Sequence, residues 1–232
     1  MTTPRSADEP LGERANTGDD AIELVQVSQN QLILFTKAPE LGNVKTRLAA
    51  EVGAARALEV HNQLVTSALK RLCGAECFEV VLCVTKVNQA VKDWANKFTI
   101  PITLQPSGDL GARMYGALAT ASAEKVVLVG SDCPDIDSDY VKQAFETLEY
   151  KPVVFGPAED GGYGLIGVRQ SPLKKIVSLF EEIPWGGDQV FEITTKRLER
   201  LRIKYGVLPT IWDVDVLEDW QRLLKADPNF LQ

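Results

Sequence analysis

The sequence contains few histidines and cysteines and has no long apolar run. Its 232 residues include one histidine, His61, and four cysteines, of which no two have the C-x-x-C spacing of a zinc or redox site. A histidine zinc site or a Ser–His–Asp triad would have to be built on His61 alone. Purely apolar runs are short, such as residues 126–129, whereas a membrane-spanning helix needs about 20 such residues. We therefore expect a cytoplasmic protein with reduced thiols and no membrane segment.

An excess of basic charge is also lacking. The chain carries 25 lysines and arginines against 32 aspartates and glutamates, which gives a formal net charge of −7 at pH 7. Proteins that bind nucleic acid through its phosphates are usually basic and cluster their cations on one face. The composition therefore argues against nucleic acid as a partner, but it is compatible with a local cationic site for a small phosphate ligand.

The N-terminal residues differ in composition from the rest of the chain. Residues 1–20 are rich in Thr, Pro, Ser, Gly and acidic side chains and contain few large apolar ones. This composition is typical of a disordered tail, and residues 21–29 read as a short lead-in. The segment lacks the apolar stretch of a secretory signal, so we expect none. We predict a tail over residues 1–30 and one domain over residues 31–232.

Short apolar runs alternate with helical patterns along the predicted domain. We expect strands at residues 32–35, 80–84, 102–104, 126–129, 153–155 and 163–168, and extended chain at 206–212. Helices are expected around residues 58–72, 87–98, 114–121, 141–148, 190–201 and 217–224. This alternation predicts an α/β fold, a three-layer α/β/α arrangement around a mostly parallel sheet. The rhythm changes after residue 155, and the strand at 163–168 is expected to run antiparallel.

Ligands of such sheets bind at the carboxyl ends of the strands, so the loops there are the candidate sites. The loop over residues 36–47 places Lys37, Lys45 and Arg47 between a strand and a helix start. Backbone N–H groups at a helix start favour anions, and three added cations suit a di- or triphosphate. The loop is neither a Walker A nor a G-x-G-x-x-G motif. A solvated basic helix start explains the same residues equally well.

Other polar side chains also follow predicted strands or stand at turns. Asp132 follows a buried strand, where one or two carboxylates suit Mg²⁺, although a turn role is the alternative. Asp109 precedes a helix and is either a cap or a ligand contact. Asp160, before Gly161 and Gly162, is either a catalytic base or part of a hairpin turn.

The remaining candidates each have a plain structural alternative. Asp213 and Asp215 share one side of an extended segment, but Asp215 followed by Glu218 also fits a capping box. Trp185 suits stacking on a base or sugar, or simple packing. His61 lies on the apolar face of its helix, which favours a packed, hydrogen-bonded histidine over a catalytic one.

Five ordered stretches together carry a family resemblance. They are residues 35–39 with 42 and 45–48, residues 108–111 with 113–114, residues 130–134, residues 160–163, and residues 213–215 with 218–219. Over about residues 31–226 the chain resembles the DUF2064 family, described as glycosyltransferases of the radical-SAM/selenodomain-associated transferase 1 type. The resemblance implies the GT-A fold of nucleotide-diphospho-sugar transferases. It also implies a nucleotide-binding half at about residues 31–150 and an acceptor-side half at about 151–232.

The resemblance implies roles for the matching residues. The nucleotide-binding set is Lys37, Gly42, Lys45, Arg47, Gly108, Asp109, Leu110 and Arg113. The implied metal ligands for Mg²⁺ or Mn²⁺ are Asp132 and Asp215, with only one aspartate of a D-x-D-like motif present. The assigned catalytic residues are Asp160, Lys45 and Arg47, and the assigned acceptor-binding residues are Gly161, Gly162, Tyr163 and Trp185. Gly164 stands where the family commonly has a larger residue.

The expected function is metal-dependent transfer from a nucleotide-activated donor. Glycosyl transfer from a nucleotide-diphospho-sugar to a small-molecule acceptor is the first hypothesis. Nucleotidyl transfer from a nucleoside triphosphate to a phosphorylated substrate uses the same cations and metal, with pyrophosphate as leaving group. A nucleotide-binding protein without turnover is the third hypothesis.

Overall fold

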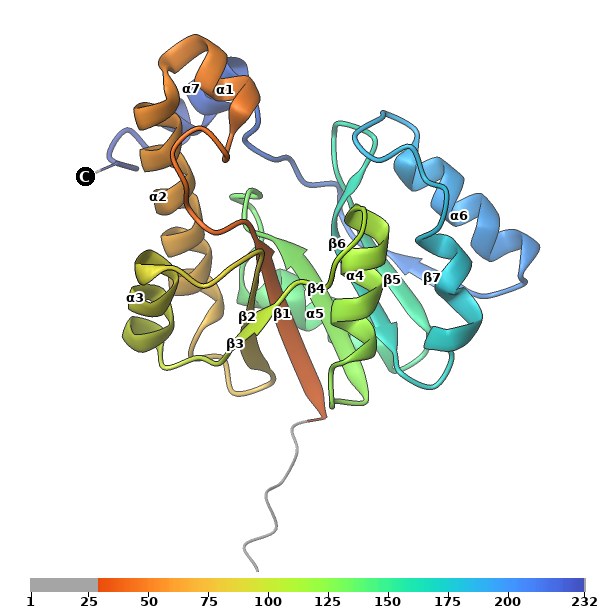
Figure 1. The fold of residues 1–232 in the computed structure, drawn as a ribbon. Coiled ribbons are helices and arrows are strands. Elements are labelled where there is room, and N and C mark those ends of the chain that lie inside the picture. Colours follow the sequence, from red (N-terminus) through yellow and green to blue (C-terminus); the bar gives the residue numbers. More distant parts are fainter. Residues whose placement is uncertain (1–28, 232) are drawn as a thin grey trace, which may run out of the picture.

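A single seven-stranded sheet runs through the molecule in the order β3-β2-β1-β4-β6-β5-β7 (Figure 1). The structure is a computed structural model that describes residues 29–231. The strands are β1 (Asn30–Thr36), β2 (Glu79–Val84), β3 (Ile102–Leu104), β4 (Lys125–Gly130), β5 (Val153–Pro157), β6 (Tyr163–Arg169) and β7 (Tyr205–Val207). The predicted tail, except residues 29–30, lies outside the described residues, and β1 begins at Asn30.

Six of the strands run in the same direction, and β6 alone runs against them. β1 pairs in parallel with β2 and β4, and β5 pairs in parallel with β7, whereas β6 is antiparallel to both β4 and β5. The five-residue connection 158–162 between β5 and β6 allows only a hairpin, because a parallel crossover needs a dozen or more residues. This confirms the antiparallel strand expected at residues 163–168 and the mostly parallel α/β sheet.

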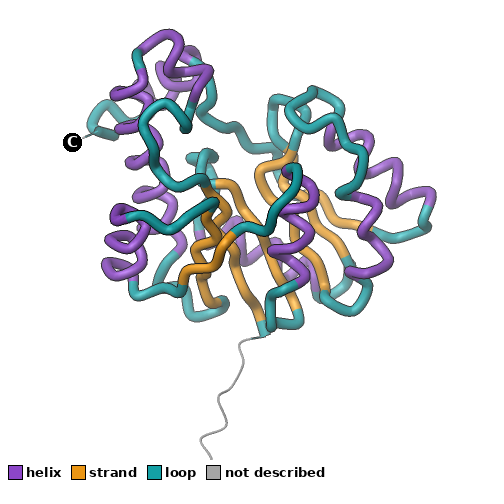
Figure 2. Tube along the Cα trace, in the orientation of Figure 1, coloured by secondary structure: helices purple, strands orange, loops and turns teal. Residues whose placement is uncertain are grey.

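Helices cover both faces of the sheet (Figure 2). They are α1 (Thr46–Val52), α2 (Ala54–Leu72), α3 (Gln89–Phe98), α4 (Leu110–Ala119), α5 (Ser138–Leu148), the 3-10 helix η1 (Leu173–Leu179), α6 (Val190–Arg200) and α7 (Leu217–Ala226). Leu32 and Leu34 of β1 pack with α2, α3 and α5, and Ile33 between them packs with α4, η1 and α6. Successive side chains of a strand point to opposite faces, which gives the predicted three layers.

A third apolar cluster holds the C-terminal segment against the start of α2. Leu48 of α1, Leu64 of α2 and Trp220 of α7 pack in it around Val214, which is fully buried. The backbone N–H of Val214 also donates to the carbonyl of Asp132, 3.0 Å away. The segment that carries Asp213 and Asp215 is therefore fixed beside the loop that follows β4.

Several predicted boundaries were wrong for local reasons. The expected helix 87–98 begins at Gln89, because the Asn88 side chain accepts a hydrogen bond from the Val91 N–H and caps it. Gly53, with φ of 83°, separates α1 from α2. Of the extended chain expected over 206–212, only β7 and a bridge at Ile211 form sheet pairs. The 3-10 helix was not predicted. No helix within residues 29–231 is long and apolar enough to span a membrane.

Candidate functional site

The loops that follow β1 and β4, the 158–162 turn and the 211–216 segment meet at one edge of the sheet. This edge holds the carboxyl ends of the parallel strands and the start of β6, because β6 runs in the opposite direction. Two adjoining cavities open there, of about 210 and 320 Å³. They share four lining residues, Phe35, Leu110, Gly130 and Asp132.

Lys45 and Asp132 form an ion pair where the two cavities adjoin. The Lys45 side chain is buried, and its Nζ lies 2.6 Å from Asp132 Oδ2 and donates to the Val214 carbonyl, also at 2.6 Å. Lys45 has left-handed backbone angles, φ 46° and ψ 46°, and such a conformation costs of order 1 kcal/mol or more in a non-glycine residue. On the other side, the Ser131 hydroxyl donates to Asp132 Oδ1 at 3.1 Å. The carboxylate of Asp132 is thus fixed from both sides.

The charge on Asp132 is stabilised by its neighbours. Burial by itself raises the pKa of Asp132, but the charges of Lys45 and His61 and the hydrogen bonds from Lys45 and Ser131 together outweigh burial. The pKa of Asp132 is therefore lowered, and the group is a carboxylate at neutral pH. An anionic ligand or a metal ion would meet a fixed ammonium and a fixed carboxylate at this point.

Asp215 is held by an arginine and does not cap α7. Arg47 Nη1 lies 2.7 Å from Asp215 Oδ2 in a largely exposed pair. The backbone N–H groups of Asp215 and Val216 donate instead to Asp219 Oδ2, at 3.0 and 2.9 Å. Asp219, three residues beyond the N-cap, therefore closes the helix start, and the capping role considered for Asp215 is wrong.

The 210 Å³ cavity, here called the cation-lined cleft, lies between the loop after β1 and the start of α4. Lys37, Lys45 and Arg113 line it, with Asp132 and Asp215 at its border. Gln105 fixes Arg113, because Gln105 Oε1 accepts from Arg113 Nη1 at 3.1 Å and Gln105 Nε2 donates to the Thr36 carbonyl. The arrangement brings together side chains from three separate loops.

Not all predicted nucleotide-binding residues reach this cleft. Lys37, Lys45, Leu110 and Arg113 line it, whereas Gly42, Arg47, Gly108 and Asp109 do not. Asp109 caps α4, since its Oδ1 accepts from the Ala112 N–H at 2.8 Å, so its structural alternative is confirmed. Gly108 has φ of 116°, which favours glycine at the turn before α4.

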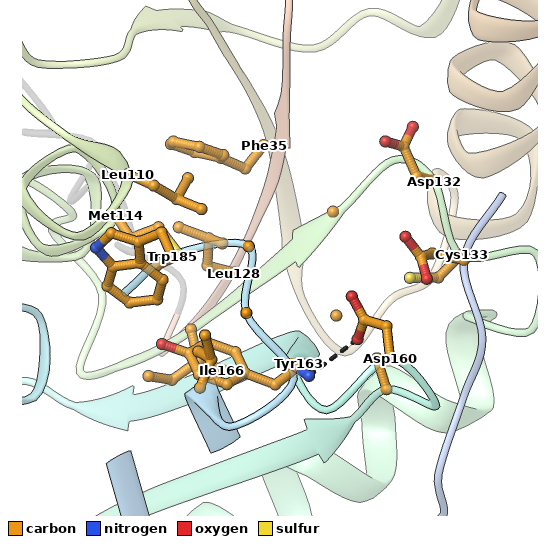
Figure 3. A pocket seen from close by; sticks show the side chains of 18 residues that line it. Phe35, Leu110, Met114, Leu128, Asp132, Cys133, Asp160, Tyr163, Ile166 and Trp185 are labelled. Carbon is orange, nitrogen blue, oxygen red and sulfur yellow. Dashed lines mark hydrogen bonds between the residues drawn. The ribbon is translucent and has the colours of Figure 1, made fainter. Parts of the chain in front are cut away.

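The 320 Å³ cavity, here called the apolar cavity, has two unlike ends (Figure 3). Phe35, Leu110, Met114, Leu128 and Trp185 gather at one end, and Asp132 and Asp160 stand at the other. The Asp160 carboxylate accepts from the Gly162 N–H at 2.9 Å, which fixes it in the turn before β6. The role of Asp160 in the turn therefore does not exclude the catalytic base role considered for the same residue.

Three of the four predicted acceptor-binding residues line the apolar cavity. Gly162, Tyr163 and Trp185 line the apolar cavity, but Gly161 does not. Gly161 has φ of 87°, and a Cβ there would lie 1.9 Å from the Asp188 carbonyl oxygen. This glycine therefore lets the turn pack against the segment before α6, while its neighbours face the cavity.

Asp213 also lines the apolar cavity and was not assigned to the site from the sequence. Burial, followed by the charges of Asp160, Asp132 and Asp215, raises the pKa of Asp213 to about 6 despite the nearby Lys45. The signal was its shared side of an extended segment with Asp215. In the structure the two aspartates border different cavities, Asp213 the apolar cavity and Asp215 the cation-lined cleft.

Two further residues support the site without entering its chemistry. Arg222 pairs with Glu159 through both of its Nη atoms, at 2.7 and 3.1 Å, and lies 4.1 Å from the centre of the Trp212 ring. Buried His61 hydrogen-bonds the Lys37 carbonyl through Nε2 at 3.1 Å, and burial lowers the pKa of His61. This is the packed, hydrogen-bonded histidine that the sequence favoured, although one side borders the cation-lined cleft.

Asp132 and Asp215 are the carboxylates of the cation-lined cleft that could hold a divalent cation. Within residues 29–231, no three His, Cys, Asp or Glu side chains come together as a complete metal site. Mg²⁺ commonly takes one or two carboxylates and completes its shell with water and phosphate oxygens. Asp132 and Asp215 both border the cation-lined cleft and offer carboxylate oxygens. Such oxygen donors suit Mg²⁺ or Mn²⁺ once a phosphate ligand supplies the remaining positions.

Comparison with known proteins identifies the class first. A "putative nucleotide-diphospho-sugar transferase" from Desulfovibrio desulfuricans G20 is 31% identical, with a TM-score of 0.78, over 87% of this chain and 89% of that one. A cytidylyltransferase from Leptospira borgpetersenii gives a TM-score of 0.58 at 17% identity, over 88% and 97% of the two chains. The 4-diphosphocytidyl-2C-methyl-D-erythritol synthase of Anaerococcus prevotii gives 0.57 at 14%, over 89% and 98%. The chain has the GT-A fold.

The family follows from the sequence. The family described as "Uncharacterized protein conserved in bacteria (DUF2064)" matches residues 68–187. The chain belongs to this DUF2064 family, as the resemblance predicted. A search among curated proteins found no match.

Proposed function

We propose that this protein is a transferase that uses a nucleotide-activated donor, and that it transfers a glycosyl group from a nucleotide-diphospho-sugar to a small-molecule acceptor. One observation carries the proposal: a cleft with Lys37, Lys45 and Arg113 and a cavity with Asp160 and Asp213 meet at Asp132. A donor diphosphate in the cleft would place the bond to be broken next to the cavity. The similarity to the Desulfovibrio protein supports this choice.

The cleft supplies positive charge for a leaving nucleoside diphosphate. Lys37 and Lys45 come from the loop after β1 and Arg113 comes from the first turn of α4, and hydrogen bonds hold Lys45 and Arg113 in place before a ligand arrives. Fixed cations lower the barrier to a departing diphosphate, because they need little reorganisation as its charge develops. Arg47 acts in this proposal through Asp215, whose carboxylate it holds.

Asp132 and Asp215 are the residues that would hold Mg²⁺ or Mn²⁺ together with the diphosphate. The metal, when bound, neutralises phosphate charge and orients the leaving group. Lys45 and Arg47 already pair with these two carboxylates, so they keep both side chains turned toward the cleft.

The transfer step uses Asp160 as proton acceptor. An acceptor hydroxyl in the apolar cavity loses its proton to the Asp160 carboxylate as its oxygen bonds to the anomeric carbon. The bond from that carbon to the diphosphate oxygen breaks, and the electron pair leaves with the nucleoside diphosphate. Positioning of the two substrates supplies much of the rate.

Nucleotidyl transfer is the second candidate, since two similar solved structures are cytidylyltransferases or related synthases. In that reaction a phosphate oxygen of the acceptor attacks the α-phosphorus of a nucleoside triphosphate, and pyrophosphate leaves. An acceptor phosphate would have to approach Asp160 and Asp213, and like charges oppose this. The glycosyl reaction is therefore favoured.

A thermal-shift and product assay tests the proposal. UDP-, GDP- and ADP-sugars and the four nucleoside triphosphates are each added with and without Mn²⁺. A bound ligand at about 100 times its Kd adds about 2.7 kcal/mol to stability. We expect one nucleotide sugar to stabilise the protein in a Mn²⁺-dependent manner and to release nucleoside diphosphate with an acceptor. Release of pyrophosphate from a nucleoside triphosphate would instead support nucleotidyl transfer. Binding without turnover would indicate a non-catalytic protein.

A matched pair of lysine variants locates that binding. Lys45→Met removes the buried ammonium of the cleft, whereas Lys142→Met changes an exposed lysine on α5 outside both cavities. We expect Lys45→Met to lose the nucleotide-dependent shift and Lys142→Met to keep it. Equal shifts in both variants would place the nucleotide outside the cleft.

A further inference from the structure

The apolar cavity is unlike a pocket built for a polyhydroxylated ligand. Its inner end is formed by Phe35, Met114, Leu128 and Ile166, and its charged groups stand together at the opposite end (Figure 3). Met114, Leu128 and Ile166 belong to the packed core between the sheet, α4 and η1. The inner wall is therefore rigid and offers side chains that neither donate nor accept hydrogen bonds.

Trp185 completes this wall without lending it polarity. Its indole packs against α4, where a Cβ at Gly111 would lie 2.6 Å from Trp185 Cζ2. The indole nitrogen lies on the side toward Leu110 and Met114, away from Asp160 (Figure 3), and it has no hydrogen-bond partner within residues 29–231. Trp185 therefore presents carbon atoms to the cavity.

Desolvation decides what such a cavity can bind. A ligand hydroxyl buried against the inner wall loses its water and gains no partner, which is unfavourable for every such group. A ring or chain carbon buried there is favourable. The cavity volume of about 320 Å³ lies at the lower end of the range of ligand pockets, so the apolar part must be small.

We propose that the acceptor is an alcohol with a compact apolar body, a single ring or a short chain, and with its reacting hydroxyl toward Asp160 and Asp213. This inference rests on the proposed function, because it names the acceptor class of the same site. The body fills the end lined by Met114 and Trp185, and the hydroxyl reaches the carboxylates of Asp160 and Asp213 at the other end. A free sugar or polyol is disfavoured as acceptor.

Two probe molecules of the same number of non-hydrogen atoms test the inference. Benzyl alcohol has an apolar ring and one hydroxyl, and erythritol has a hydroxyl on every carbon. Binding of each to the full chain is measured by titration in protein NMR spectra. We expect benzyl alcohol to bind saturably and at least ten-fold more tightly than erythritol. Equal binding, or tighter binding of erythritol, would overturn the inference.

Variants of the wall show where the probe binds. Met114→Gln places an amide in the inner wall at nearly constant volume, and Met114→Leu keeps the wall apolar. We expect at least five-fold weaker benzyl alcohol binding in Met114→Gln and less than two-fold change in Met114→Leu. If Met114→Gln does not fold, Trp185→Gln tests the half-buried side of the same wall. Unchanged binding in a folded wall variant would contradict the inference.

The same samples separate this inference from the proposed function. Nucleotide-sugar stabilisation depends on the cation-lined cleft, and benzyl alcohol binding depends on the apolar cavity. Nucleotide binding without benzyl alcohol binding would overturn the acceptor class and leave the transferase proposal standing. Benzyl alcohol binding without nucleotide binding would overturn the transferase proposal and leave the ligand class of the apolar cavity standing. If neither ligand binds, both proposals are wrong.

Discussion

The cation-lined cleft and the apolar cavity lie side by side yet have opposite chemistry. The cleft takes its side chains from loops after the parallel strands β1 and β4 and from the start of α4. The cavity takes its distinct walls from β6, the 158–162 turn and the segment before α6. The two share Asp132. Loops at the ends of the parallel strands thus supply the cations of the cleft, whereas β6 and its hairpin bring apolar surface and further carboxylates to the same edge.

The largest effect is expected at Asp132, the charged residue among the four that line both cavities. Asp132→Asn removes the carboxylate that pairs with Lys45 and, in the proposal, holds the metal. We expect activity to fall by roughly 10³-fold, comparable to loss of a central electrostatic group in other active sites. The control is Asp135→Asn, an exposed residue of the same loop outside both cavities.

Stability must be followed in that experiment. Lys45 would remain buried without its carboxylate partner, which costs up to about 3 kcal/mol, since Asp132 itself is partly exposed. Turnover is therefore measured well below the thermal midpoint of the variant. Wild-type activity in folded Asp132→Asn would show that the shared carboxylate is not the centre of the site.

A change confined to the apolar cavity comes next. A Cβ at Gly164 would lie 2.6 Å from Cys133 Sγ and 2.7 Å from Ile211 Cδ1. We expect Gly164→Ala to cost about 1–3 kcal/mol in urea unfolding, because the wall is overpacked. Nucleotide binding should be unchanged.

The partner variant makes this prediction specific. Cys133→Ala removes the buried sulfur that the new methyl group meets. In the double variant Gly164→Ala/Cys133→Ala, part of the lost stability should return, as expected for residues in contact. Strict additivity of the two changes would contradict the contact.

A change confined to the cation-lined cleft should be smaller. Arg113→Gln removes one cation that Gln105 holds toward the cleft. We expect about ten-fold weaker nucleotide binding, or about 1.4 kcal/mol, with benzyl alcohol binding unaltered. Arg56→Gln, in an exposed pair on α2, is the matched control. Loss of both ligands in Arg113→Gln would mean that the two cavities are not separable.

The smallest effect concerns His61 beneath the cation-lined cleft. Burial lowers the pKa of His61 below its usual 6.5, so the unfolded chain binds the proton first as pH falls. Stability from this group is present above pH 6.5 and is lost as pH decreases below it, by at most about 1.4 kcal/mol per pH unit. In His61→Gln, the free energy of unfolding measured in urea should depend less on pH between pH 7 and 5. If it depends on pH as strongly as in the wild type, His61 is not the source of this dependence.

The fold could be predicted from periodicity because the buried strands are short apolar runs and the helices have one apolar face. Leu32 to Phe35 and Val126 to Val129 were recognised for this reason. The direction of β6 could not be read from its side chains, since a buried strand looks the same in either direction. It follows from the short hairpin before it, which is a matter of connection length.

The candidate site was predictable where a residue follows a strand directly. Asp132 lies in the loop just after β4, as expected, whereas Lys45 lies at the far end of the loop after β1, where α1 begins. The role of Asp109 was ambiguous, because capping and ligand binding both suit an aspartate before a helix. In the structure its carboxylate accepts a hydrogen bond from the Ala112 N–H and caps α4. Asp213 required knowledge of the fold, because its position beside Asp160 depends on the burial of Val214 against α2 and α7.

The reversed strand β6 has a consequence for how this protein can diversify. Because β6 starts at the edge where the parallel strands end, the 158–162 hairpin lies at the same edge as the loops of the cation-lined cleft but lines the apolar cavity. Insertions or substitutions in that hairpin would reshape one cavity while the neighbouring loops keep theirs. Changes in this hairpin would therefore alter the ligand of the apolar cavity and leave the ligand of the cation-lined cleft unchanged.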